Sequence, residues 1–459
     1  MARMKPLACL LLLPLVACTR GRPGDSTGES SAPIDTHESA DSDDSGVEPP
    51  VANYTLSWGD LHAHTNLSHD GCEDPDNLCL PESDLPGELL YVHAAAKSFA
   101  FVANTDHAEI DTWSRLSDGL SVQSWDRSHE MLAAAGPTGV LPILGYEYTA
   151  IAGHRTVIFD GDEVCATYRK SSHVPSEPKA EVGLESYTFG PTDDYGSPAD
   201  LEAALDAAGE ADGCDPVPWI SFAHHPAFAT PTATYWTDDR NRIDSDRVVE
   251  IASEHGSSEC EDITQEDCDY RVIEQRYDGD GSVQTALRLG YRLGFVGGSD
   301  NHEGTATVPG DEPGYNGTFI DTDGDGIGDT PAEQSFAGAI TGVYHDGTLT
   351  RPMLFDALNA RHSLAATWSF DSVTLHAYDS EGVLYLPGDD LPAGTYTLVV
   401  DVADEDLSSW VAEIVDPTDG SVTEETEFEV TSGSALYVRV RADVSGVEHR
   451  IWASPFFGG

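Results

Sequence analysis

Basic side chains are scarce in this chain of 459 residues: 23 lysines and arginines stand against 81 aspartates and glutamates, a formal net charge of −58. A chain this acidic repels polyanions, which argues against nucleic acid as its partner. We interpret most of the charge as a solvated surface, with bound divalent cations offsetting part of it. The hydrophobic fraction of 39% suffices for a sizeable core, so wholesale disorder is not expected.

Long apolar runs are also missing. The run at 7–17 is too short to cross a bilayer, and the two basic residues before it are typical of a signal peptide. Leu15-Val16-Ala17-Cys18 resembles the bacterial lipobox, in which Cys18 becomes the lipidated first residue; an ordinary secretory signal is the alternative. Residues 19–52 lack hydrophobic periodicity, which predicts a disordered acidic tether. We therefore expect an exported bacterial lipoprotein, held by its lipid to a membrane on the periplasmic or cell-surface side.

The cysteines show no zinc-ribbon spacing. Six remain after the signal segment and the lipidation site, and an even number in an exported chain indicates disulfides. In the simplest connectivity, cysteines close in sequence pair with each other, as Cys72–Cys79 and Cys260–Cys268, which leaves Cys165–Cys214 as the third pair. The sequence does not prove this connectivity.

Short apolar runs alternate with amphipathic stretches from Tyr54 onward. The pattern predicts strands and helices in turn, with strands at 54–61, 99–104, 140–145, 155–159, 217–223, 247–252 and 293–297, and helices at 85–97, 125–135, 200–209, 282–291 and 352–361. This order favours a parallel α/β fold, and a barrel would gather residues from so many strand ends better than an open sheet. We predict such a barrel domain at 53–370. The β-prone runs after it predict a small β-sandwich-like domain at 371–459.

Possible metal ligands follow these strand-like runs repeatedly. Two histidines spaced as His-x-His at a strand end point to the same side, because side chains alternate along a strand. Glu147 lies in an apolar setting where a lone carboxylate is poorly tolerated without a cation. Imidazole and carboxylate are the usual ligands of zinc, manganese and iron. The pattern predicts a multinuclear metallohydrolase with ligands at His62, His64, Asp70, His107, Glu147, His154, His224, Asp300 and His302.

The same segments closely resemble the PHP (polymerase and histidinol phosphatase) superfamily over about residues 58–302. The matching motifs are His62-Ala63-His64-Thr65 with Ser68 and Asp70, Thr105-Asp106-His107, Gly145-x-Glu147, the histidine before Pro226, and Asp300-x-His302. Within the superfamily the chain looks most like the branch called domain of unknown function 3604. The motifs carrying that closer match are Trp58-Gly59-Asp60-Leu61, Val249-Glu250-Ile251 with His255-Gly256, Gly298-Ser299-Asp300, and Ala360-Arg361.

The resemblance implies a distorted seven-stranded (β/α)7 TIM-like barrel that holds two or three divalent cations, zinc, manganese or iron. By analogy, His62, His64, Glu147 and Asp300 hold one metal. Glu147 bridges to a second metal, which His224 or His225 holds and to which His154 adds a ligand. The third metal takes Asp70, His107 and His302, with His69 as an alternative to Asp70.

A phosphoesterase acting on small phosphate esters is the first functional hypothesis. Cations this close would activate a water for in-line attack on phosphorus and stabilise the developing charge. Glu147 is a catalytic candidate as the bridging ligand, and Asp106 and His255 are candidates for protonating the leaving group. The sequence shows no cluster of Arg and Lys to grip phosphate, so hydrolysis of C–N or C–O bonds stays open. A surface binding protein with structural metals is a further alternative.

A separate acidic motif interrupts the strand–helix rhythm. Its carboxylates have the spacing of a calcium loop, with glycine at the sharp turn, although the usual twelfth-position glutamate is missing. We predict structural calcium there, with an acidic solvated turn as the alternative, and the carboxylates are Asp321, Asp323, Asp325 and Asp329.

Overall fold

A computed structural model of the chain describes residues 54–65, 67–68, 86–108, 122–150, 153–168, 197–211, 213–227, 234, 236–237, 245–262, 278–301 and 338–459. All of them belong to one of the two units into which the chain divides, Val47–Gly459. Several sequence predictions fall outside the described residues and stay predictions: the signal segment with Cys18, the tether, the Cys72–Cys79 pair, Asp70, His302 and the calcium loop at 321–329. Among the residues described, no helix is long and apolar enough to cross a membrane.

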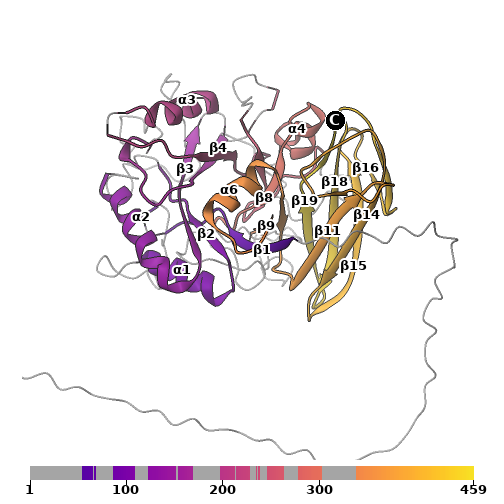
Figure 1. Ribbon diagram of the computed structural model, residues 1–459, viewed down its shortest axis with the longest axis horizontal. Coiled ribbons are helices and arrows are strands. Elements are labelled where there is room, and N and C mark those ends of the chain that lie inside the picture. The colour runs from indigo at the N-terminus through magenta and orange to yellow at the C-terminus, as the bar shows by residue number, and fades with distance from the viewer. Residues whose placement is uncertain are drawn as a thin grey trace, which may run out of the picture. The chain divides into compact units, whose positions relative to one another are not determined.

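The first two thirds of the described chain is a mixed α/β structure (Figure 1). Its strands are β1 (Thr55–Asp60), β2 (Phe101–Asn104), β3 (Leu141–Ala150), β4 (Gly153–Phe159), β5 (Trp219–Ala223), β6 (Val248–Ser253), β7 (Gly256–Ser257), β8 (Gly294–Gly297), β9 (Ile340–His345) and β10 (Ser363–Ala366). Its helices are α1 (Pro86–Ala96), α2 (Val122–Ala135), α3 (Pro198–Ala208), α4 (Val283–Arg288) and α6 (Arg351–Asn359), with 3₁₀ turns η1 (Gly136–Thr138), η2 (Ala166–Tyr168) and η6 (Gly279–Gly281).

Local sequence accounts for these elements. All four residues of β2, Phe-Val-Ala-Asn, are buried, as expected of a parallel strand covered on both faces. Helix α3 begins at a capping box, in which Ser197 and Asp200 each accept a hydrogen bond from the other's backbone N–H, and Pro198 occupies its first turn. Figure 1 shows α1 and α2 beside β2 and β3, which they contact.

The strand directions are only partly parallel. Strands β1, β2 and β3 are parallel neighbours, and β6 pairs in parallel with β8 in a second, smaller sheet. Strand β4, however, is antiparallel to both β3 and β5. Only two residues separate β3 from β4, whereas a parallel connection needs about a dozen. The expectation of a purely parallel sheet was therefore wrong.

A closed barrel is not established by the strand pairing. Strand β5 contacts β6, and β8 contacts β9 and β10, but hydrogen bonds among the described strands do not join them into one ring. The distorted (β/α)7 barrel stays a prediction. Candidate ligands nevertheless follow the carboxyl ends of β1, β2, β5, β6 and β8, and two more lie within β3 and β4.

Strands alone make up the C-terminal part. One sheet contains β11 (Ser372–Tyr378), β12 (Leu384–Tyr385), β14 (Gly394–Ala403) and β17 (Glu427–Val430). The other strands are β13 (Asp390–Leu391), β15 (Leu407–Asp416), β16 (Ser421–Thr423), β18 (Ala435–Val444), β19 (Val447–Ala453) and β20 (Phe456–Gly458). The two sheets share a hydrophobic core that includes Leu375 and Leu398 from the first and Val440 and Ile451 from the second. Strand β19 also pairs with β10, so the second sheet continues the sheet of the α/β part.

A buried polar network joins the C-terminal strands to the segment after β7. Glu259, which is 2% exposed, accepts hydrogen bonds from Tyr437, Arg439 and Trp452. Arg439 also donates to the buried Glu413 at 2.7 Å. Buried charges with several partners each are expensive to separate, so this network fixes the segment that follows His255 against the C-terminal sheet.

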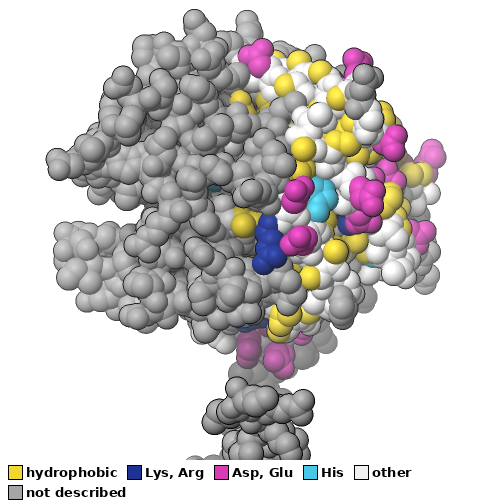
Figure 2. All heavy atoms as spheres, turned by 90° about the vertical axis from the view of Figure 1, so that its left-hand side faces the viewer, with side chains coloured by type: hydrophobic (Ala, Val, Ile, Leu, Met, Phe, Trp, Pro, Cys, Tyr) yellow, Lys and Arg dark blue, Asp and Glu magenta, His cyan; other side chains and the backbone are white. Residues whose placement is uncertain are grey.

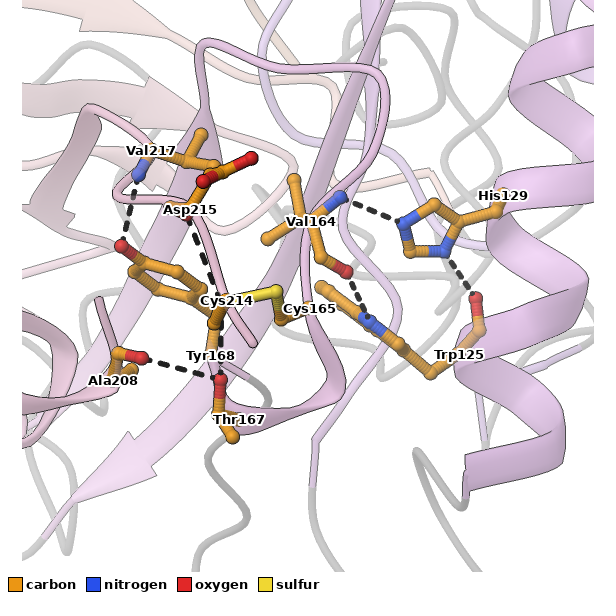
Figure 3. Close-up of a disulfide and its surroundings, with 10 residues drawn as sticks. All are labelled: Trp125, His129, Val164, Cys165, Thr167, Tyr168, Ala208, Cys214, Asp215 and Val217. Carbon is orange, nitrogen blue, oxygen red and sulfur yellow. Dashed lines mark hydrogen bonds between the residues drawn. A yellow bond between two sulfur atoms is a disulfide. The ribbon is translucent and has the colours of Figure 1, made fainter. Parts of the chain in front are cut away.

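One of the predicted disulfides lies between described residues. Cys165 and Cys214 are bonded, with Cα atoms 5.9 Å apart (Figure 3). The Trp125 indole donates to the carbonyl of Val164 beside them, at 3.1 Å. The predicted Cys165–Cys214 pair is therefore confirmed. Cys260 also belongs to a disulfide, and its predicted partner Cys268 lies outside the described residues.

Candidate metal centre

Four side-chain atoms from three separate segments converge, two from residues that follow β1, one from within β3 and one from a residue that follows β8. They are His62 Nε2, His64 Nε2, Glu147 Oε2 and Asp300 Oδ1, and we call them the central cluster. His62 Nε2 lies 3.1 Å from His64 Nε2, 3.1 Å from Glu147 Oε2 and 3.4 Å from Asp300 Oδ1. His64 Nε2 lies 3.2 Å from Glu147 Oε2 and 3.1 Å from Asp300 Oδ1. None of the four residues is more than 1% exposed.

This spacing fits a tetrahedral metal ion. Ligands bound at about 2.0 Å to a tetrahedral zinc ion lie about 3.3 Å from one another. The separations of 3.1–3.4 Å in the central cluster are close to that edge length. Two nitrogens and two carboxylate oxygens also form a donor set that zinc, iron and manganese accept. The residues of the central cluster therefore fit a divalent cation.

Backbone hydrogen bonds hold the ligand segments against one another. The N–H of His64 donates to Asn301 at 2.9 Å, the N–H of Asp300 to His62 at 2.8 Å, and the N–H of Glu147 to Asp106 at 3.1 Å. Asp300 has a φ of 53°, in the left-handed region that a non-glycine residue rarely adopts. Such strain persists where the surroundings over-determine a conformation, which is common at functional sites.

Contacts made by the Nδ1 atoms of His62 and His64 fix the orientation of both rings. His62 Nδ1 lies 2.9 Å from Glu250 Oε2, and His64 Nδ1 lies 2.9 Å from Ser68 Oγ. Each contact turns Nε2 toward the centre of the cluster, as carboxylates and hydroxyls beside metal-binding histidines usually do. Gly298 makes room for this packing, because a Cβ there would come within 2.5 Å of His62 and 2.6 Å of Glu250.

Glu147 extends the site on one side. Its Oε1 contacts His154 Nδ1, and its Oε2 lies 3.6 Å from His107 Nε2. Glu147, His107 and His154 form a second possible metal position, which we call the Glu147 flank. The sequence analysis read Glu147 as following a strand that ends at 145. The residue instead lies inside β3, opposite Thr156 of β4, so the hairpin brings His154 to it.

Asp300 extends the site on the other side. Its Oδ2 lies 3.2 Å from His224 Nε2 and 3.1 Å from His255 Nε2. We call Asp300, His224 and His255 the Asp300 flank. His225, whose ring centroid lies 3.8 Å from that of His224, and Glu254 are also within ligand distance of its members.

Buried charge gives the site a potential that favours cations. Burial lowers the pKa of His62, but attraction by Asp300 and Glu250 outweighs it and raises that pKa well above its usual value. Burial opposes ionisation of Glu147, yet His107 and His154 hold its pKa well below the ordinary range. In the metal-free protein these interactions favour an ionised Glu147 beside a protonated His62. A bound metal would supply the positive charge that this proton otherwise provides.

The predicted residues fall into three groups. The structure brings His62, His64, His107, Glu147, His154, His224 and Asp300 together, and Asp70 and His302 lie outside the described residues. The Asp106 carboxylate bonds to Thr65 and not to these residues: its Oδ1 and Oδ2 accept hydrogen bonds from the Thr65 hydroxyl at 3.0 and 2.8 Å. Its role as a proton donor stays a prediction. Burial raises the Asp106 pKa.

Sequence reasoning missed Glu250 and Glu254. Glu250 is a single acid within the buried strand β6, and its Oε1 lies 2.5 Å from His224 Nδ1. The signal that pointed to Glu147, a carboxylate inside an apolar run, was present at Glu250 as well. His255 lies beside Asp300 and other possible ligands, and its expected role as a proton donor stays a prediction.

No protein-family model matches the chain, and a search of curated proteins returns no match. The solved structures that are similar to this chain include two proteins. One is a two-domain protein from Bacteroides vulgatus ATCC 8482 that contains a domain predicted to be a PHP-like metal-dependent phosphoesterase, with 14% identity, a TM-score of 0.40, and coverage of 88% of this chain and 98% of that one. The other is a proposed metal-dependent phosphoesterase from Bifidobacterium adolescentis ATCC 15703, with 18% identity, a TM-score of 0.27, and coverage of 56% and 89%. Both similarities are too low to carry a functional assignment, which therefore rests on the side chains described above.

Proposed function

We propose that this chain is a PHP-like metal-dependent hydrolase, acting as a phosphoesterase on small phosphate esters. The observation that carries the proposal is the central cluster: two imidazole nitrogens and two carboxylate oxygens, fully buried and spaced as the ligands of one tetrahedral ion. The motifs quoted for the PHP resemblance supply the same four residues, His62, His64, Glu147 and Asp300.

Each residue then has a definite task. His62, His64, Glu147 and Asp300 would hold one cation, and Glu147 with His107 and His154 could hold a second. Bound divalent cations would lower the pKa of a water and polarise a phosphoryl oxygen. Glu250 and Ser68 keep the imidazoles oriented. Burial of the central cluster excludes bulk water, which strengthens every electrostatic interaction inside it.

Substrate would approach from the flanks. The side chain of His154 is 17% exposed and that of His255 is 22% exposed, whereas the central residues are at most 1% exposed. A central position with four protein ligands is closed, whereas the Glu147 flank, with three possible ligands, would keep room for water or substrate.

The first experiment is a hydrolase screen of the purified protein, loaded in turn with zinc, manganese and iron. We expect turnover of generic phosphomonoesters or phosphodiesters with at least one metal, and none after chelation. Chelation followed by reloading provides the internal control. Metal binding without turnover of any phosphate ester would contradict the phosphoesterase assignment.

A second candidate, hydrolysis of C–N or C–O bonds, is favoured by one observation. Among the described residues, the ion pairs of the cluster join histidines and carboxylates, with no Lys or Arg of the kind that commonly binds phosphate. Figure 2 likewise shows many more acidic than basic side chains on the described part of the face it presents. Amide, lactone and ester substrates in the same screen separate the two candidates.

We also propose that the chain is exported and anchored by a lipid on Cys18. The Cys165–Cys214 disulfide supports export, since disulfides persist in oxidising compartments. The test is incorporation of labelled palmitate in cells that express the chain, with Cys18→Ser as the matched control. Labelling that survives Cys18→Ser would contradict this anchor.

A further inference from the structure

Three arginines gather at the amino ends of neighbouring strands, away from the metal ligands. Arg247 directly precedes β6, Arg292 lies two residues before β8, and Arg361 lies two residues before β10. Strands β6 and β8 are parallel neighbours, and β10 contacts β8. Glu254 and Asp300 follow the other ends of β6 and β8. Since β6 has six residues, about 20 Å of strand separates the arginines from the metal ligands.

We propose that Arg247, Arg292 and Arg361, which we call the arginine cluster, bind a phosphate-like oxyanion, that is, a phosphoryl or sulfuryl group. The site is separate from the metal centre and does not depend on the proposed function. The sequence shows no local run of basic residues, because the three arginines are far apart in the chain and only the fold brings them together.

Phe457 holds two of the guanidinium groups in place. The Cζ atom of Arg292 lies 4.4 Å from the centre of its ring, and that of Arg361 lies 5.2 Å from it. The ring is itself 1% exposed and belongs to a hydrophobic core cluster, so its position is fixed. Arg247 is joined to the same place by its carbonyl, which accepts a hydrogen bond from the N–H of Gly294 at 2.7 Å. The arginines are thus positioned before any ligand binds.

Arg361 has a backbone conformation that favours glycine. Its φ is 63°, and it follows the last residues of α6, where helices commonly end on a left-handed glycine. The neighbouring chain fits closely around it: a Cβ on Gly294 would come within 2.7 Å of the Arg361 Cβ, and one on Gly388 within 2.3 Å of the Arg361 carbonyl oxygen. A strained residue in close-fitting surroundings is common at functional sites, so this conformation indicates a role for the side chain.

The positive charges of the cluster repel one another. Burial lowers the pKa of Arg361, and Arg292 and Arg247 lower it further by repulsion, although Asp389 opposes the shift. Like charges held this close attract an anion, in a chain whose net charge of −58 otherwise repels anions.

The acidic residues beside the cluster are exposed or engaged elsewhere. Asp390 pairs with Arg292, but the two side chains are 61% and 42% exposed, so the pair contributes little. Asp389 Oδ1 lies 2.9 Å from His362 Nε2, and the buried Asp246 is paired with an arginine of β4. An anion at the cluster therefore competes mainly with the exposed Asp390.

Donor atoms of Arg361 remain available to a ligand. Among the described residues, its side chain makes one hydrogen bond, from Nε to the Gly388 carbonyl at 3.3 Å. The two terminal nitrogens can donate to an anion, and a guanidinium binds phosphate or sulfate oxygens through two parallel hydrogen bonds. Three guanidinium groups suit a doubly charged tetrahedral oxyanion better than a single carboxylate.

Sulfate titration of the full-length, zinc-loaded protein tests the proposal. Calorimetry at constant ionic strength should show one equivalent of sulfate bound by wild type, and inorganic phosphate should compete for it. We expect Arg361→Gln to weaken sulfate binding roughly 10- to 100-fold, the effect of losing hydrogen bonds to a charged group. Arg127→Gln is the matched control, because it removes the same charge from a surface ion pair on α2, and it should bind sulfate as wild type does.

Three further variants keep the result decisive. Asp390→Asn should tighten sulfate binding, because the competing carboxylate is removed. Glu147→Ala, in which metal binding is weakened, should keep its sulfate affinity and so separates the cluster from the metal centre. If Arg361→Gln does not fold, Arg361→Gly adopts the left-handed conformation without strain and should show the same loss of sulfate binding.

Vesicles distinguish the two sources of such an oxyanion. If the Cys18→Ser protein is retained on vesicles that contain phosphatidic acid, and Cys18→Ser/Arg361→Gln is not, the ligand is a lipid headgroup. Sulfate binding without retention on vesicles identifies a soluble anion. Sulfate affinity that is unchanged in Arg361→Gln, or absent from wild type, would overturn the proposal. Neither of these last results bears on hydrolysis at the metal centre.

Discussion

The Nε2 atoms of His62 and His64 lie 3.1 Å apart, and both face Glu147 and Asp300. The outer nitrogen of each ring is already engaged, by Glu250 and by Ser68. Two imidazole nitrogens held this close need a proton or a cation between them and their carboxylate partners, because their lone pairs otherwise repel. The predictions below follow from this arrangement and from the buried groups around it.

Replacing Glu147 by alanine should lower metal content and abolish hydrolysis. Glu147 contributes to the central cluster and to the Glu147 flank, so its loss weakens two positions at once. We expect metal affinity to fall by more than the roughly 10- to 100-fold typical of an outer-shell partner. Elemental analysis and hydrolysis assays measure both effects. An unchanged stoichiometry would show that Glu147 is not shared between metals.

Replacing Glu250 by glutamine should weaken metal binding about 10- to 100-fold without a change in the ligands themselves. A carboxylate accepts hydrogen bonds from both His62 and His224, whereas an amide offers only one accepting oxygen. Competition with a chelator measures the affinity. Glu413→Gln is the control, because this carboxylate is equally buried but bonds to Arg439. We expect that variant to lose stability and keep its metal affinity.

Metal binding should release protons near pH 8. The pKa of His62 is raised well above its usual value, and that of His224 is raised to about 9 because Glu250 outweighs the effect of burial. Both rings are then protonated in the metal-free protein and must lose protons to bind a cation, so affinity should rise with pH. Calorimetry in buffers of different ionisation enthalpy counts the protons. An enthalpy that is independent of the buffer would contradict this prediction.

Removing the disulfide should destabilise the fold without emptying the site. In the chain-entropy description, a link between residues 49 apart in sequence stabilises by about 4 kcal/mol. We expect the double variant Cys165→Ser/Cys214→Ser to lose about that free energy of unfolding in urea titrations. Its metal content should match wild type, since neither cysteine belongs to a ligand cluster. If the double variant lost metal at urea concentrations that leave it folded, the disulfide would be shown to support the metal ligands, contrary to this prediction.

Asp246 should make the metal-free protein less stable as pH rises from about 4 to 7. Burial raises its pKa from 3.8 to about 6, although the ion pair with Arg155 opposes the shift. The folded state therefore binds this proton more tightly than the unfolded state, so stability is highest below the unfolded pKa and falls through the folded one. Between about pH 4 and 7, the free energy of unfolding of Asp246→Asn should rise relative to that of wild type by on the order of 3 kcal/mol. Urea titrations at several pH values measure the difference in the free energy of unfolding. If wild type instead became more stable than Asp246→Asn as the pH rises, the ion pair with Arg155 would outweigh the effect of burial.

The sequence by itself determined which residues bear the chemistry and roughly where the helices begin and end. Helix α1 covers Pro86–Ala96 where 85–97 was expected, since apolar spacing and capping are local properties of the chain. His62 and His64 were predicted to face one way because side chains alternate along a strand, and both Nε2 atoms do face one point.

Only the tertiary structure decided which residues share a metal position. The hairpin between β3 and β4 brings His154 to Glu147, and the two carboxylate oxygens of Asp300 face His64 on one side and His224 on the other. The partners of Glu250 could not be identified from the sequence, because His62 and His224 are 188 and 26 residues away from it. Contacts of that range depend on how strands are ordered and directed in space, which local periodicity does not specify.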